Sequence, residues 1–131
     1  MTILDEVAAY LATAGVGTVG TDIFKSRMPD TPDKALAIIE YEGLPGSYIQ
    51  EQQFAAWEKP RLQVRARATD YVTAEAFILL AYRAIDTIRN VTLSGVKYLM
   101  GQPLQAPFLL ERDANERTVM CFNAEFWRTL S

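Results

Sequence analysis

The stretch from residue 60 to residue 90 constrains the fold more than any other part of the chain. The sequence alternates strictly between polar and apolar residues over 61–69, and its apolar members are Leu62, Val64, Ala66 and Ala68. A period of two indicates a β-strand with one apolar face and one polar face. A helical pattern follows over about 72–89, with apolar residues at Phe77, Leu80, Ala81, Ala84, Ile85 and Ile88. A strand followed directly by an amphipathic helix predicts a two-layer core in which the helix packs on a sheet.

The segments on either side complete the predicted fold. We expect a helix over 2–14, a hairpin made of strands 22–28 and 35–42, an irregular loop over 43–59, a connection over 90–95, a strand over 96–102, and a last hairpin made of 107–112 and 116–128. Helix one begins at a capping box formed by Thr2 and Asp5. The predicted class is therefore α+β: a mostly antiparallel mixed sheet packed by two helices, in the order α-β-β-β-α-β-β-β.

Length and composition restrict the protein class. The 131 residues fit one domain over 1–131, and 50% of them are hydrophobic, which is typical of a globular protein. The net charge of −3 disfavours a basic nucleic-acid binder. The sequence contains no histidine, so the commonest general base and metal ligand is missing, and its single cysteine forms no intramolecular disulfide. We find neither a secretory signal nor an apolar run of membrane-spanning length, and expect no membrane partner.

No pattern in the sequence predicts a catalytic, cofactor-binding or metal site, and we expect a protein that is not an enzyme. Gly15, Gly17 and Gly20 match the spacing of a dinucleotide-binding loop, but they follow a helix and lead into a strand, which is the opposite context. Glu40 and Glu42 share one strand face. A cation site is conceivable there, whereas a solvated edge or a salt bridge at an interface is favoured.

Three groups of residues are candidates for contacts with other molecules. Arg65 and Arg67 form a positive stripe that meets acidic residues or nucleic acid, or else a solvated face whose side-chain stems cover apolar surface. Ile78 and Tyr82 give the second helix more apolar surface than one sheet needs, so helix one or another subunit packs there. The aromatic residues of the loop 43–59 are partner anchors or covers of the sheet edge: Tyr48, Phe54 and Trp57.

Several local patterns occur in a fixed order along the chain. They are Gly17-Thr-Val-Gly20 leading into Ile23-Phe24, Met28-Pro-Asp-Thr-Pro-Asp33 before Ala37-Ile-Ile-Glu-Tyr41, Gly43-Leu-Pro45, and Pro60-Arg-Leu-Gln-Val-Arg-Ala-Arg67 before a helix. This succession resembles the tail terminator family of long-tailed bacteriophages, whose members are also known as tail completion proteins or minor capsid proteins. The resemblance spans nearly the whole chain.

The resemblance implies a virion protein of the tail or neck, assembled in the host cytoplasm, without cofactor or enzymatic activity. Such proteins form a homohexameric ring at the head-proximal end of the tail tube, stop polymerisation of the tail tube protein, and offer a surface to the head connector or a neck protein. Subunit contacts are then expected at Glu40, Glu42, Arg65, Arg67, Ile78 and Tyr82, and tube or neck contacts at Tyr48, Phe54 and Trp57.

An acidic ring would let DNA pass through its lumen without specific binding, so we expect Arg65 and Arg67 to be paired across subunits. A head–tail connector adaptor, or a head completion protein of the neck, is the alternative. A small enzyme with a carboxylate site is disfavoured by the absence of histidine and of any recognisable nucleophile.

Overall fold

The computed structural model of the protein describes residues 2–48 and 55–129. These residues form two helices and seven strands: α1 (Ile3–Thr13), β1 (Ile23–Lys25), β2 (Ala35–Tyr48), β3 (Ala55–Ala68), α2 (Tyr71–Asp86), β4 (Arg89–Leu93), β5 (Val96–Pro103), β6 (Phe108–Arg112) and β7 (Thr118–Thr129). The strands lie in one mixed, mostly antiparallel sheet, which confirms the predicted α+β class. The predicted capping box is also present, because Thr2 and Asp5 exchange hydrogen bonds at the start of α1.

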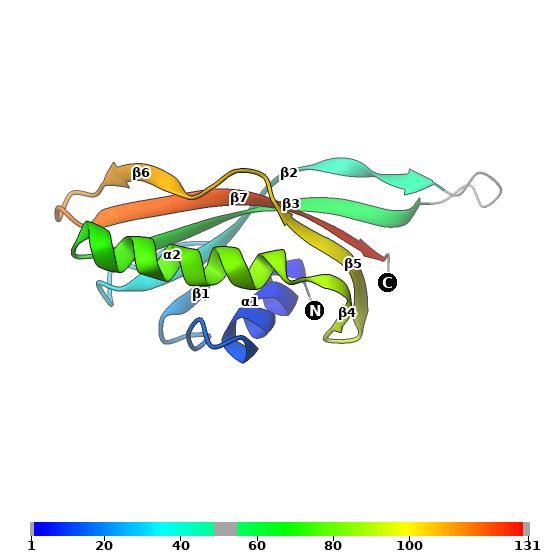
Figure 1. The fold of residues 1–131 in the computed structure, drawn as a ribbon, viewed down its shortest axis with the longest axis horizontal. Coiled ribbons are helices and arrows are strands. Elements are labelled where there is room, and N and C mark those ends of the chain that lie inside the picture. The colour runs from blue at the N-terminus through cyan, green and yellow to red at the C-terminus, as the bar shows by residue number, and fades with distance from the viewer. Residues whose placement is uncertain (1, 49–54, 130–131) are drawn as a thin grey trace.

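The strand order in the sheet is β1-β2-β3-β7-β5-β4, and β6 pairs with the first part of β7. Both helices lie on the same face of this sheet (Figure 1), with α2 along β3, β7 and β5 and α1 against β1 and β2. The alternation read from the sequence is confirmed in β3, since its four predicted apolar residues are all buried under the helices. No helix formed by the described residues lies on the opposite face of the sheet.

The first predicted hairpin is wrong. Ile23 of β1 pairs with Leu36 of β2 in parallel, because the chain makes a wide return between the two strands. Ser26 has a positive φ of 76°, which turns the backbone away directly after β1, and its N–H donates to the Ile38 carbonyl at 2.9 Å. Between the two strands, residues 26–34 bring the chain back to the end of the sheet at which β1 begins, so β2 runs in the same direction as β1.

The loop expected over 43–59 is mostly a long β-hairpin. Gly43-Leu-Pro-Gly46 does not stop the strand, because β2 continues to Tyr48 and pairs with β3 through Leu44 with Lys59 and Ser47 with Trp57. Register shifts separate these pairs. A sheet edge tolerates proline and glycine in this way, since the outer side of an edge strand needs no hydrogen-bond donor. We call residues 42–60 the arm; Figure 1 shows its strands running well past the end of α2.

A seventh strand was not expected. The predicted connection 90–95 contains β4, which forms a tight hairpin with β5 through the pair Leu93 and Val96. Ser94 and Gly95 link them with φ values of 49° and 85°. Two positive φ values in succession are typical of the two-residue hairpin turn whose twist matches that of paired strands.

The core fills the space between the sheet and the helices. The α2 residues that face the sheet are Ala74, Phe77, Ile78, Ala81, Ala84 and Ile85, all buried. The core stripe predicted for this helix is therefore rotated: Leu80 is 48% exposed and Ile78 is fully buried. The spacing from residue 74 through 77, 78, 81 and 85 keeps to one helical face, and Leu80 lies off that face.

Candidate assembly surface

The polar side of β3 lies on the face of the sheet opposite the helices, which we call the outer sheet face. The antiparallel register places Gln63 opposite Asn123 and Arg61 opposite Glu125 on β7. Because directly opposed residues share a face, polar side chains of the two strands meet in pairs along the middle of the sheet.

Hydrogen bonds join these side chains into two groups, one around Glu125 and one around Gln63. Arg61 Nε donates to Glu125 Oε2 at 3.0 Å, and Trp127 Nε1 donates to Glu125 Oε1 at 2.9 Å. Gln63 Nε2 donates to Asn123 Oδ1 at 3.2 Å, and Gln63 Oε1 accepts from Arg65 Nε at 2.6 Å. The outer sheet face is therefore a preorganised polar surface, with its side chains held in defined directions before any partner binds.

The two arginines predicted as one positive stripe are in different situations. Arg67 is only 4% exposed, and its guanidinium donates to the carbonyl oxygens of Pro32 and Asp33 in the turn before β2. Burial, together with the nearby Arg117, lowers the pKa of Arg67. Arg65 is half-buried and bonds only to Gln63 among the described side chains. Their pairing across subunits stays a prediction, with Arg65 the one whose side chain reaches the surface.

Arg117 holds together one end of the sheet, and the sequence analysis did not single it out. Its guanidinium contacts Asp30 at 2.8 Å, Asp33 at 3.2 Å and Asp113 at 2.7 Å. The hydrogen bond to Asp30 raises the pKa of Arg117, although burial acts in the opposite direction. Burial alone would raise the pKa of Asp113, but the hydrogen bonds from Arg117 lower the pKa of this carboxyl below its usual value. The turn before β2 and the β6–β7 turn are thus fixed by one cation.

A second buried cluster ties α1 to the other end of the sheet. Glu6 is 1% exposed and accepts from the Tyr98 hydroxyl at 2.6 Å and from Arg128 Nη1 at 2.7 Å. Arg128 also pairs with Glu58 at the root of the arm. Burial, and then the bond to Glu6, raises the pKa of Tyr98. This cluster places α1 and the arm in fixed positions relative to β5 and β7.

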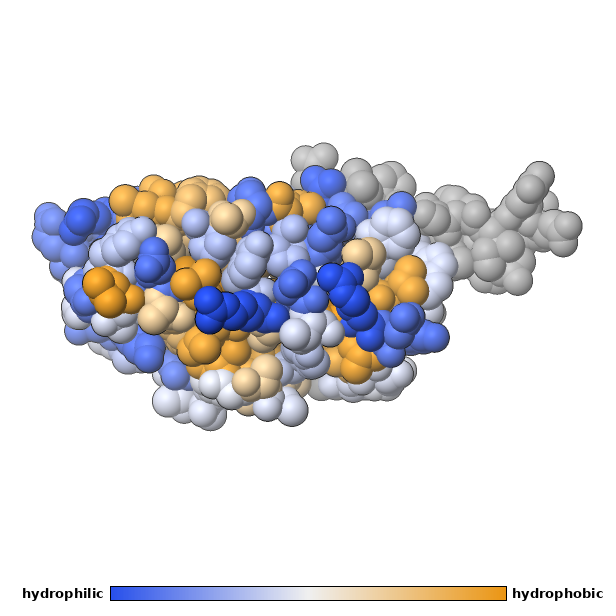
Figure 2. Space-filling view, in the orientation of Figure 1, coloured by the Kyte–Doolittle hydropathy of each residue, from blue (hydrophilic) through white to orange (hydrophobic). Residues whose placement is uncertain are grey.

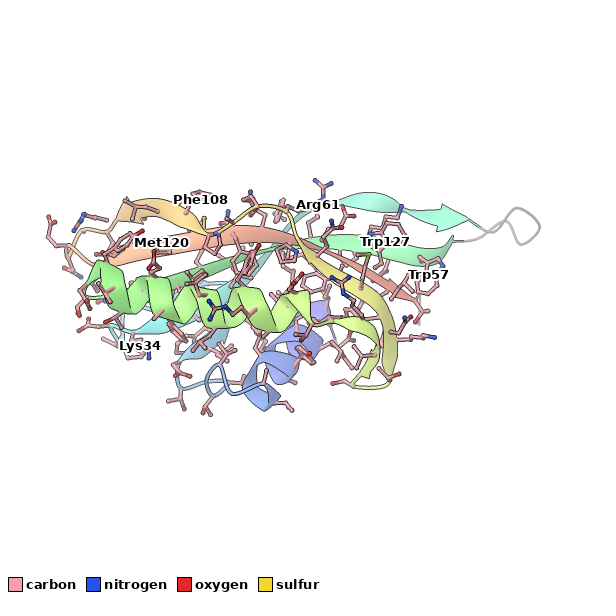
Figure 3. All side chains as sticks on the ribbon, in the orientation of Figure 1. Lys34, Trp57, Arg61, Phe108, Met120 and Trp127 are labelled. Atoms are coloured by element: carbon pink, nitrogen blue, oxygen red, sulfur yellow. The ribbon has the colours of Figure 1, made fainter. Side chains whose placement is uncertain are left out.

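The remaining predicted contact residues are placed as follows. Ile78 lies in the subunit core, and Tyr82 packs edge-to-face on Phe122 with 5.4 Å between ring centroids. Glu40 is exposed on β2, and Trp57 lies at the root of the arm (Figure 3). For Glu42 and Tyr48 only the backbone is described, and Phe54 lies outside the described residues. The structure leaves all of their contact roles as predictions.

An apolar surface that the sequence analysis missed lies around β6. Leu104 is 42% exposed, and the exposed fractions of Phe108, Leu109 and Leu110 are 40%, 47% and 36%. Figure 2 shows apolar side chains gathered along the upper edge of the molecule, over β6, with further apolar spots over α2 below them. We call the run 104–110 the apolar edge segment. The signal that the sequence analysis missed was the consecutive apolar run 108–110, which was interpreted only as one strand of a hairpin.

Pockets and metal-ligand groups add little to the site. A pocket of about 270 Å³ lies between α1 and β4, with Tyr10, Val91 and Leu93 in its lining. Within 2–48 and 55–129, no three acidic or cysteine side chains are close enough to hold a metal ion. Neither of the two helices has the length and apolar character needed to cross a membrane.

Comparison with known proteins identifies a matching family and a solved structure with a similar fold. The model of a family described as bacteriophage tail terminator protein matches residues 10–129. The fold is similar to that of a chain in a structure titled "Virion of native gene transfer agent (GTA) particle", with a TM-score of 0.68 and 13% sequence identity over 98% of this chain and 95% of that chain. No curated protein sequence matches this chain.

Proposed function

The chain belongs to the bacteriophage tail terminator protein family, and from this membership we propose that it forms a homohexameric ring at the head-proximal end of the tail tube. The ring stops polymerisation of the tail tube protein and provides the surface to which the head connector or a neck protein joins. The family match over residues 10–129 is the observation that carries this proposal. The coarser conclusion, a structural role at the end of a phage tail, follows from the family itself.

The charges of the described residues fit a ring through which DNA passes without being held. Arg61, Arg117 and Arg128 are paired with carboxylates of their own subunit, and Arg67 is capped by backbone carbonyls. A guanidinium that is already paired has little net attraction for a phosphate. With a net charge of −3 on each copy, we infer that DNA slides through the lumen without specific binding.

The arm fits a contact with the tube or the neck. Its described strands run beyond both helices (Figure 1), which suits a contact made apart from the body while the body packs against neighbouring copies. Trp57 is at its root and pairs with Ser47 and Thr129. Large aromatic side chains at accessible positions are the commonest anchors of protein–protein contacts. We therefore propose tube or neck contact for the arm through Trp57, and keep the expectation from the sequence that Tyr48 and Phe54 take part.

The test is polymerisation of the cognate tail tube protein with and without this chain, followed by electron microscopy and sedimentation. We expect shorter tubes, each with a ring at one end. Unchanged tubes together with binding to the head connector would replace the proposal by the neck-adaptor function. Unchanged tubes without such binding would reject both functions.

A further inference from the structure

Strand β6 has a free edge that exposes apolar side chains to water. It pairs with β7 on one side only, and no other described strand lies on its second side. All five of its residues are exposed, three of them large and apolar in succession. Soluble proteins usually protect such edges with charge, proline or a covering element, because unpaired backbone groups beside apolar side chains recruit another strand. The first three residues of β6 lack such protection, although Glu111 and Arg112 follow them, and this apolar part of the edge indicates a partner.

The same subunit carries a second free edge. Strand β1 covers β2 only from Leu36 to Ile38, and from Ile39 to Tyr48 no described strand pairs with the outer side of β2. Ile39 and Tyr41 are partly exposed there, and Glu40 is exposed. The two edges lie on opposite sides of the β2–β3–β7–β6 part of the sheet, so they cannot meet within one subunit.

Charge and side-chain direction match between the two edges. Arg112 on β6 is opposite Thr118 and thereby shares the side of the sheet that the helices cover; Glu40 on β2 is opposite Leu62 and points to the same side. Both are exposed, and neither forms an ion pair with a described residue. When Arg112 lies opposite Glu40 in an antiparallel pair, Phe108 on β6 (Figure 3) comes level with Leu44 on β2, so apolar residues of the two edges also fall at the same height.

We propose that β6 of one copy adds to the free edge of β2 of the next copy, antiparallel, with Arg112 paired to Glu40 across the contact. The inference rests on the proposed ring and names its subunit contact. Two different edges that join head to tail form a heterologous interface, which closes into a ring when the rotation per copy allows it. Backbone hydrogen bonds give the contact its geometry, and burial of the apolar edge segment gives it its driving force.

A charge exchange tests the pair. Glu40→Arg and Arg112→Glu are each expected to raise the concentration needed for half-maximal tube capping by about tenfold, since each brings like charges together. The double variant Glu40→Arg/Arg112→Glu restores the pair and is expected to return close to wild type. Lys97→Glu is the matched control, because Lys97 is exposed on β5, a strand with neighbours on both sides. Circular dichroism confirms that each variant is folded.

Zero-length cross-linking tests the contact directly. Arg112→Lys keeps the charge and allows a carbodiimide to join the new amine to Glu40. Within one subunit three strand spacings, about 14 Å, separate β2 from β6, so only a link between copies is expected. A ladder of chain multiples on a denaturing gel, with the linked peptides identified by mass spectrometry, supports the proposal.

The outcomes separate this contact from the ring itself. Suppose that the wild type caps tubes. If the single variants then cap equally well, or if the double variant caps no better than either single variant, the β6–β2 contact is overturned and the terminator function still stands. Wild type that neither caps nor assembles on tubes would overturn the function, and this inference with it.

Discussion

At the scale of single residues, Asp5 links helix capping to pH. Its carboxylate accepts from Lys25 Nζ at 2.6 Å and from the Thr2 N–H at 3.0 Å, and these bonds, that from Lys25 first, lower the pKa of Asp5 from 3.8 to about 2. A carboxyl whose pKa is lower in the folded state stabilises the fold above its unfolded pKa, and loses that contribution as the pH falls through the folded value.

We therefore predict a pH-dependent effect of Asp5→Asn. At pH 6 the variant unfolds at a lower urea concentration than wild type, and this difference shrinks as the pH falls from about 4 to about 2. Urea titrations at pH 6, 4 and 2 measure it. Asp86→Asn, at an exposed helix end with only a 3.6 Å contact to Arg89, is the control and is expected to show a smaller change. A difference that persists unchanged at pH 2 would refute the assignment.

Residue-scale contacts were the least predictable part of the site. The alternation of β3 placed the arginines on a polar face correctly, because a strand's side-chain directions follow from its period of two. It could not show that Arg67 is buried against a turn 34 residues away, or that Arg117 binds acidic residues 84 and 87 positions distant. Such pairs depend on how the sheet brings distant turns together, and no local pattern records that.

At the scale of elements, a strand or helix was predictable when its apolar and polar residues follow a clear period. Strand β3, helix α2 and the β6–β7 hairpin were predicted at the right places in the chain, although the core stripe predicted for α2 included the exposed Leu80. The parallel β1, the arm and β4 were not predicted correctly, because each depends on an edge or a turn rather than on a period. Like the apolar run 108–110, Ser94-Gly95 was an overlooked local signal, since this dipeptide is typical of a two-residue hairpin turn.

The docking of α1 gives an element-scale prediction. Replacing Glu6 by alanine leaves the buried Tyr98 hydroxyl and one side of Arg128 without their acceptor. We expect a loss of about 3 kcal/mol in the free energy of unfolding, the usual cost of removing one partner of a buried ion pair. Urea denaturation followed by tryptophan fluorescence measures it. Glu75→Ala, in an exposed part of α2, is expected to change stability by less than about 0.5 kcal/mol; equal losses in both variants would contradict the role of the cluster.

At the scale of the whole molecule, the structure separates a compact body from the projecting arm. The body holds the Arg117 cluster, the Glu6–Tyr98–Arg128 contacts, the free edge of β6 and the free edge of β2 at 39–41, whereas the arm extends away from the helices (Figure 1). This division suggests a division of contacts, with copies joined through the body and the tube or neck reached by the arm. Variants of the arm should then affect capping without affecting assembly of the copies.

Trp57→Ala tests that division. Trp57 is only partly buried, so truncation should change stability little, while loss of an aromatic anchor typically weakens a contact by tenfold or more. We expect about ten times more protein to be needed for half-maximal tube capping, with unchanged cross-linking between copies in the Arg112→Lys background. Tyr71→Ala removes an exposed aromatic side chain at the far end of the body, on α2, and should leave both measurements unchanged. If Trp57→Ala capped tubes like wild type, or abolished cross-linking as well, contacts with the tube and between copies would not be divided between arm and body.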